Sequence, residues 1–273
     1  MADAEAMQFR GETMPLIQKI LLHIPLIPLG IIMVILAVAL SVTGLWIVWR
    51  FVPRNILKAH NDLTNAIFQA IALAYTVLLA FVVVVAWQNY DKAIAHTETE
   101  ANCLVDLYRS SSAFGKPFET EAHSLVGDYV KIVMREEWAS LGRGEESMKA
   151  RTILRDMWLH YMSYEPKTEK ESIFYTESIN KLDDLREMRR LRIIDSRTGI
   201  HPVLWFVLTV GAITTISFTF FFGSDKFINH AIMASILSVI IVLILLTILS
   251  FSFPFTGSGR IEPKMFMQVI GLR

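Results

Sequence analysis

Four long stretches without a charged residue constrain the fold of this chain more than any other feature of its sequence. The stretches are Ile20–Trp49, Leu63–Tyr90, Thr198–Ser224 and Phe227–Gly259. A helix needs about 20 mostly apolar residues to cross a hydrocarbon core about 30 Å thick. Each stretch exceeds that length, which excludes an ordinary soluble domain and predicts four transmembrane helices. We place these spans at 24–49, 64–90, 202–223 and 228–252.

The remaining charge is concentrated between the second and third spans. The chain has 26 Lys+Arg and 26 Asp+Glu, and 37 of these residues fall between Asp91 and Arg197. Apolar residues recur there at helical spacing, as in Ala122, Val126 and Tyr129. Three breaks divide the segment into four predicted helices: Gly115-Lys116-Pro117, Gly142-Arg143-Gly144 and Tyr164-Glu165-Pro166. The sequence therefore predicts an all-α membrane protein with a helical cytoplasmic domain, 91–200, inserted between the second and third spans.

Two further segments and one long helix complete the predicted organisation. Residues 1–23 form an N-terminal tail in which apolar residues at helical spacing are consistent with an interfacial helix, and 253–273 form a C-terminal tail. No Gly or Pro occurs from Arg54 to Phe114. We therefore expect Asn61–Ser112 to be one continuous helix that contains the second span and the first helix of the inserted domain.

Basic residues flanking the spans predict the orientation of the chain, because Lys and Arg are retained on the cytoplasmic side. With four spans, both termini and the inserted domain share one side. That side carries eleven basic residues near the spans: Arg10, Lys19, Lys92, Arg186, Arg189, Arg190, Arg192, Arg197, Arg260, Lys264 and Arg273. The opposite side carries Arg50, Arg54, Lys58 and Lys226. The asymmetry predicts a cell-membrane protein with its termini and 91–200 in the cytoplasm, although three basic residues within 50–62 locally favour the reverse.

Several short motifs occur in the order found in a known family. They are His60-Asn61, Ala80-Phe81-Val82-Val83-Val84, Trp87, Glu100-Ala101, Tyr129, Glu137-Trp138, Pro202-Val203-Leu204-Trp205, Gly211 and Pro254-Phe255-Thr256-Gly257. Their order and spacing resemble the bestrophin-like membrane family, a distant relative of the bestrophin ion channels. Where that family often has an acidic residue two positions before the Pro-Phe pair, this chain has Ser252. A role that needs a carboxylate there is not expected.

The resemblance implies a homo-oligomer, a pentamer, whose second spans surround an axial ion pore. One face of the second span fits this expectation with small and polar side chains near helical repeats. The candidate pore-lining residues are Asn65, Gln69, Ala72, Thr76, Leu79 and Val83. The level of Leu79 or Val83 would supply an apolar constriction. Asn, Gln, Thr and small residues also mediate packing between spans, so helix packing is the competing interpretation of this face.

The same helix face continues beyond the span through Asp91, Glu98 and Asp106. In an oligomer these residues would form acidic rings in a cytoplasmic vestibule and attract cations. The alternative is an ordinary solvated helix face. Basic residues on the outer side keep chloride open as the conducted ion.

The remaining cysteine, histidine and acidic residues do not form a recognisable cofactor or metal motif, so we expect neither. A single cysteine, Cys103, forms no intrachain disulfide and is interpreted as a small buried residue. His230, like the other histidines at span ends, is interpreted as a solvated interfacial residue. Glu136-Glu137 either binds a cation between subunits or is a helix-surface acidic pair beside a core tryptophan, and we favour the second interpretation. Zero net charge gives no sign of nucleic-acid binding.

Three functional hypotheses follow. The first is an oligomeric channel whose partners are the lipid bilayer and inorganic ions, with passive conduction because no span contains an ionisable Asp, Glu, Lys or Arg for proton coupling. The second is a non-conducting membrane adaptor or sensor whose cytoplasmic helices bind a partner. The third, a membrane enzyme, lacks a recognisable catalytic motif, so we expect the protein not to be an enzyme.

Overall fold

The computed structural model describes residues 24–271, and every regular element in that range is a helix. The interfacial helix predicted within 1–23 lies outside the described residues. The described chain divides into two compact units. Residues 24–89 and 199–252 form the first, here called the membrane unit, and 90–198 with 253–271 form the second, here called the charged unit. The two units are described separately.

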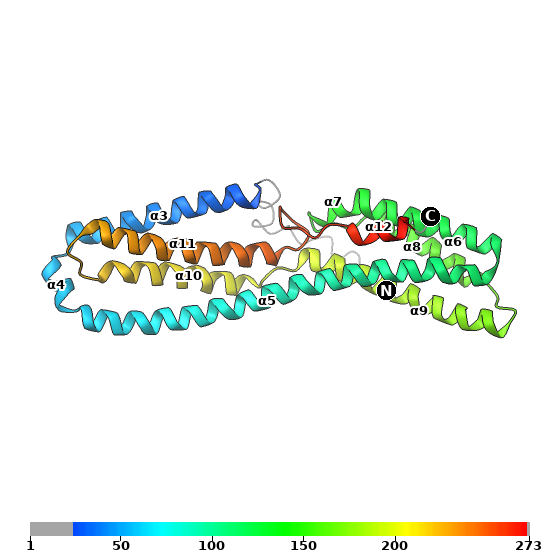
Figure 1. The fold of residues 1–273 in the computed structure, drawn as a ribbon, viewed down its shortest axis with the longest axis horizontal. Coiled ribbons are helices and arrows are strands. Elements are labelled where there is room, and N and C mark those ends of the chain that lie inside the picture. The colour runs from blue at the N-terminus through cyan, green and yellow to red at the C-terminus, as the bar shows by residue number, and fades with distance from the viewer. Residues whose placement is uncertain (1–23, 272–273) are drawn as a thin grey trace. The chain divides into compact units, whose positions relative to one another are not determined.

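The membrane unit contains three long apolar helices and part of a fourth. They are α3 (Leu26–Phe51), the first part of α5 (Asn61–Ser110), α10 (Pro202–Phe218) and α11 (Phe227–Ser252), with the short α4 (Arg54–Ala59) and a 3-10 turn (Thr219–Phe221) in the connections. By length and composition, four helical stretches of the described chain could cross a membrane: Leu26–Phe51, Asn61–Phe114, Glu169–Phe221, which contains α10, and Phe227–Ser252. In Figure 1, α3 runs alongside α11. Proline begins two of them, because Pro25 precedes α3 and Pro202 occupies the first turn of α10.

Glycine and aromatic residues set how closely these helices approach one another. A Cβ atom on Gly211 of α10 would lie 2.5 Å from the ring of Tyr75 of α5. The same ring is held by its hydroxyl, which donates to the Leu208 carbonyl at 3.0 Å. Similarly, a Cβ on Gly44 of α3 would lie 2.6 Å from the Phe220 ring. Small residues at crossings are typical of helices packed in a membrane.

Large apolar side chains cover much of the outside of the membrane unit. Ile27 is 74% exposed, Phe206 69% and Ile228 70%. Water would disfavour so large an apolar surface, whereas lipid chains solvate it without cost. The surface of this unit therefore supports the membrane assignment independently of helix length.

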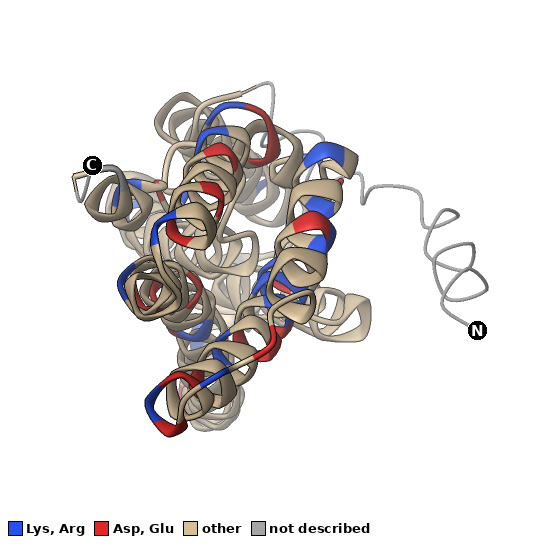
Figure 2. Cartoon of the chain, turned by 90° about the vertical axis from the view of Figure 1, so that its right-hand side faces the viewer, with Lys and Arg blue, Asp and Glu red and all other residues tan. Residues whose placement is uncertain are grey.

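The charged unit is built from the second part of α5 and the helices that follow it. These are a 3-10 turn (Ser111–Phe114), α6 (Lys116–Ile132), the π-helical turn η3 (Val133–Glu137), α7 (Trp138–Leu141), α8 (Met148–Met162), α9 (Glu169–Arg197) and α12 (Lys264–Ile270). The breaks fall where glycine and proline predict them. Ser147 caps α8 and Thr168 caps α9, each accepting a hydrogen bond from a backbone N–H of the first turn. Acidic and basic positions are interspersed along the helices (Figure 2).

The segment after α11 contributes to the core of the charged unit rather than forming a separate tail. Phe255 and Phe266 are 2% and 0% exposed, and both rings contact Trp138 at centroid distances of 5.6 and 5.7 Å. The Trp138 indole donates a hydrogen bond to the Ile261 carbonyl at 2.9 Å. The residues 253–271 thus pack directly against α6 and α7.

α5 is one unbroken helix of 50 residues, as the absence of Gly and Pro predicts. At 1.5 Å per residue its length is about 75 Å, far more than a membrane span requires. Tyr75, Leu79, Val82 and Ala86 are buried in the membrane unit, and Ala93, Leu104 and Leu107 in the charged unit. A single helix therefore supplies core residues to both units.

Candidate functional site

The candidate pore face of α5 is partly exposed on the single chain. Asn65, Gln69 and Thr76 are exposed, whereas Ala72 and Val83 are half-buried. Three hydrogen-bonding side chains therefore point away from the core of the membrane unit, in a stretch of α5, 65–87, whose other exposed residues are apolar. In lipid such groups lack a hydrogen-bonding partner, so they favour contact with water or with another protein surface.

Leu79 differs from the other members of this face. It is 5% exposed and belongs to the core of the membrane unit with Tyr75 and Val82, and Val83 packs at the edge of that core. The apolar level expected as a constriction therefore lies against the other helices of the same chain. The exposed polar residues of this face are Asn65, Gln69 and Thr76, and Leu79 is not among them.

The three acidic residues beyond the span differ in their surroundings within the charged unit. Asp91 is exposed, and Glu98 and Asp106 are half-buried. The Asp106 carboxylate lies 3.5 Å from the Lys181 ammonium of α9. Asp106 is therefore partly neutralised by its own chain, which leaves Asp91 and Glu98 as the stronger sources of negative potential on this helix.

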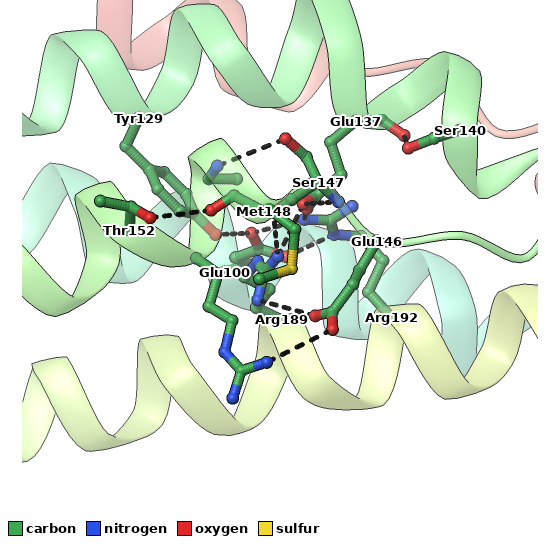
Figure 3. Close-up of polar contacts among 12 residues, drawn as sticks. Glu100, Tyr129, Glu137, Ser140, Glu146, Ser147, Met148, Thr152, Arg189 and Arg192 are labelled. Carbon is green, nitrogen blue, oxygen red and sulfur yellow. Dashed lines mark hydrogen bonds and ion pairs between the residues drawn. The ribbon is translucent and has the colours of Figure 1, made fainter. Parts of the chain in front are cut away.

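A buried network of four charges lies in the charged unit and was not predicted. Arg192 of α9 makes a bidentate ion pair with Glu100 of α5, with Nε–Oε2 and Nη2–Oε1 distances of 2.6 and 2.9 Å. Its Nη2 also donates to Glu137 of η3 at 2.7 Å. Arg189, one turn earlier on α9, donates to the other oxygen of Glu137 at 2.7 Å. Figure 3 shows these residues converging from three elements.

Neutral groups complete the hydrogen bonding of the two carboxylates. The Tyr129 hydroxyl of α6 donates to Glu100 Oε1 at 2.7 Å, and the Ser147 backbone N–H donates to Glu137 Oε2 at 3.1 Å. Glu100, Glu137 and Arg192 are 0% exposed and Arg189 is 6% exposed. Buried charges are tolerated when they are paired and hydrogen-bonded, and this set of two acids and two bases sums to zero.

The electrostatics of the network favour the charged forms of Glu137 and Arg192. Burial opposes the charged form of Glu137, but the guanidinium groups of Arg192 and Arg189 outweigh it and lower the pKa of the carboxyl. Burial likewise disfavours charge on Arg192, yet Glu100 and Glu137 raise its pKa above the ordinary value. Burial together with the Glu100 charge raises the pKa of Tyr129, so its hydroxyl remains a donor. At neutral pH, Glu137 and Arg192 are therefore charged and Tyr129 is protonated.

Aromatic rings cover the Arg192 side of the network. The guanidinium carbon of Arg192 lies 5.1 Å from the centroid of the Trp138 ring and 6.0 Å from that of Phe266. Both distances fall in the range of cation–π contacts. The residues 253–271 thereby help to exclude water from the buried charges.

Two interpretations based on the sequence are wrong. Glu137 is not part of a helix-surface acidic pair, because it is buried against two arginines; only Glu136 is exposed, where it pairs with Lys149 at 2.9 Å. His230 is not solvated, since it is 6% exposed and its Nε2 contacts the Thr219 carbonyl at 2.8 Å. The interpretations of Trp138 and Cys103 as core residues are confirmed, at 5% and 3% exposed.

Within residues 24–271, no group of three or more His, Cys, Asp or Glu side chains is arranged to hold a metal ion. Ser252, which stands where the resembling family often has an acidic residue, is buried and donates to the Ile248 carbonyl at 2.6 Å. The structure thus offers no carboxylate ligand at that position.

The sequence matches the family described as the bestrophin-like domain over residues 35–266, which is most of the chain. The chain belongs to the bestrophin-like family. A comparison with functionally curated proteins finds no match for this bestrophin-like protein.

Solved structures of bacterial bestrophin homologues share the fold of this bestrophin-like chain. A variant of the homologue from Klebsiella pneumoniae has a TM-score of 0.67 at 17% identity, covering 86% of this chain and 97% of the homologue. A second structure of a homologue from that organism has a TM-score of 0.64 at 15% identity, covering 88% and 95%. At such identities the likeness establishes the fold. The resemblance based on motif order is therefore confirmed at the level of family and architecture.

Proposed function

We propose that this protein is an ion channel assembled from several copies of the chain, in which α5 lines an axial pore and ions move passively. The observation that carries the proposal is the exposure of Asn65, Gln69 and Thr76 on a stretch of the span, 65–87, whose other exposed residues are apolar. A water-filled path between subunits gives these side chains hydrogen-bonding partners. Membership of the bestrophin-like family supports a channel over the adaptor hypothesis.

In this proposal the pore wall consists of Asn65, Gln69, Ala72 and Thr76, with Leu79 and Val83 supporting it from the core of each subunit. The assembly is a homo-oligomer, and the family resemblance favours a pentamer. Repeating α5 around an axis would also bring together copies of Asp91 and Glu98, whose carboxylates would attract cations to the inner mouth. Asp106 contributes less because Lys181 lies 3.5 Å away.

We also propose that the protein lies in the cell membrane, with both termini and 91–200 in the cytoplasm. The larger number of basic residues near the spans on that side supports this orientation. Charged residues of both signs on the helices of the charged unit are compatible with an aqueous compartment.

Recording from purified protein tests the proposal. The full chain would be extracted in a mild detergent, its mass measured by native mass spectrometry, and the same fraction reconstituted into planar bilayers under asymmetric KCl. We expect a homogeneous oligomer and stepwise currents. Their reversal potential should be shifted from zero toward the equilibrium potential of potassium. A homogeneous monomer, or an inserted oligomer that passes no current, would refute the channel. A reversal potential shifted toward the equilibrium potential of chloride would refute only the role given to the acidic residues.

A further inference from the structure

The buried charge network is one of the contacts between the candidate pore helix and α9, together with His96–Asp195 and Asp106–Lys181. Glu100 lies on the same continuous helix as Gln69 and Thr76. Arg192 donates two parallel hydrogen bonds to the Glu100 carboxylate and one to Glu137. The guanidinium group is planar and the directions of its donors are fixed. A bidentate pair therefore restricts both the rotation of the helix that carries the carboxylate and its translation along its axis.

A need for stability alone does not explain why charges occupy this position. Well-packed apolar residues of similar volume are often as stabilising as a buried ion pair, or more so. The surrounding core already consists of such residues, including Leu104, Leu107 and Leu185. A charge network differs from them in directionality, since its hydrogen bonds are satisfied only over a narrow range of helix positions.

The network also contains donors that are not used. Arg189 Nε and Arg192 Nη1 are buried and have no hydrogen-bonding partner. These spare N–H groups offer Glu100 and Glu137 a second set of bonds within the same two guanidinium groups. We infer that a small shift of α5 against α9 would bring these N–H groups into use in place of some of the present bonds. The adjacent π-helical turn that carries Glu137 is a kind of distortion often found at functional sites.

We propose that Glu100, Glu137, Arg189 and Arg192 form a positioning element for the pore helix, one that sets the balance between open and closed channels. The inference rests on the proposed channel function. The four residues act through α5 and do not contact the permeating ion. They therefore control how often the pore is open, and the current through an open pore is independent of them.

Single-channel recording of matched variants tests this role. Glu100→Gln keeps the size of the side chain but removes its charge, and Glu136→Gln makes the same change at an exposed residue that pairs only with Lys149. We expect Glu100→Gln to change the ratio of open to closed time about tenfold, which corresponds to 1.4 kcal/mol, with unitary conductance unchanged. Glu136→Gln should leave both quantities as in the unchanged protein. Hydrogen exchange of 91–110 should be faster in Glu100→Gln alone.

Tyr129→Phe provides a second test that keeps all four charges and removes only the 2.7 Å hydrogen bond to Glu100. It applies if Glu100→Gln fails to assemble, and we expect a change of about two- to tenfold in the same ratio. Assembled variants that gate like the unchanged protein, or that alter unitary conductance instead, would overturn the positioning role while leaving the channel intact. Absence of current from the unchanged protein would defeat both proposals.

Discussion

At the scale of single residues, the exposed polar side chains of α5 and the glycines at helix crossings have different requirements. Gln69 and Thr76 need a hydrogen-bonding partner outside their own membrane unit, whereas Gly211 needs the absence of a side chain. The two groups can therefore be tested by opposite kinds of substitution. Adding apolar bulk at the first tests the pore, and adding a single methyl group at the second tests the packing.

Replacing Gln69 or Thr76 with Leu should lower unitary conductance while oligomer yield is retained. Each substitution removes a hydrogen-bonding group from the proposed pore wall and narrows it. Val77→Leu, an exposed neighbour about 100° around the helix from Thr76, serves as the control. Oligomer mass and single-channel current would be measured on the same preparations. Reduced assembly with normal current would instead assign this face to contacts between spans, where an interhelical hydrogen bond contributes about 0.6 kcal/mol.

Gly211→Ala should destabilise the membrane unit by about 1–3 kcal/mol, because the new methyl group overlaps the rigid ring of Tyr75. Gly30→Ala is the matched control. Its methyl group would lie 3.1 Å from the terminal Leu246 Cδ1, which can rotate away. Thermal unfolding of both variants in the same detergent compares them. Equal melting temperatures would show that α5 and α10 tolerate a wider separation than the structure indicates.

At the scale of elements, the sequence predicts the helices well and the charge network poorly. Charge-free runs identify spans because lipid excludes charge, and Gly115 and Pro166 mark breaks because of their backbone properties. Glu100 and Arg192, in contrast, look like surface charges on charge-rich helices. The available signal was position: Glu100 falls on the same side of α5 as Ala93, Leu104 and Leu107, which are buried. Its partner on α9 is 92 residues away and could not be identified from the sequence alone.

The network should make the charged unit sensitive to acid. The pKa of Glu137 is lower in the folded chain than its ordinary value of 4.5, because Arg192 and Arg189 outweigh the effect of burial. A carboxyl shifted in this direction stabilises the fold above its unfolded pKa, and that contribution is lost as pH falls through the folded pKa. The melting temperature should therefore decrease as pH drops below 4.5, the ordinary value.

Glu137→Gln should reduce this acid dependence in addition to lowering the melting temperature at neutral pH. Glu136→Gln should retain the full acid dependence, since it leaves the buried pair intact. Scans of melting temperature from neutral pH downward on the three proteins provide the measurement. Parallel curves for all three would exclude Glu137 as a source of the effect.

At the scale of the whole molecule, the orientation of the chain in the membrane determines which residues are accessible from each side. The basic-residue count gives one orientation, and the basic residues within 50–62 oppose it locally. Exposed sites in each region allow a direct test. Lys58 precedes α5 and Arg151 lies on α8, and both are exposed.

Labelling intact cells with a membrane-impermeant maleimide should modify Lys58→Cys but not Arg151→Cys, each made in a Cys103→Ser background. The background removes the single native thiol, which is buried and has its pKa raised to about 11 by burial. Both variants should be labelled after cell lysis, which controls for reactivity. Labelling of Arg151→Cys alone in intact cells would reverse the orientation and place the acidic residues of α5 outside.

The neutrality of the buried quartet has a consequence for how the protein tolerates changes in ionic strength. Exposed pairs such as Arg190–Glu187 are screened by dissolved salt, with a Debye length of about 8 Å at physiological concentration. Ions do not enter the interior that contains Glu100, Glu137 and Arg192, which are fully buried. The ion pairs that position α5 should therefore keep their strength when the salt concentration around the protein changes, as it would beside the proposed pore.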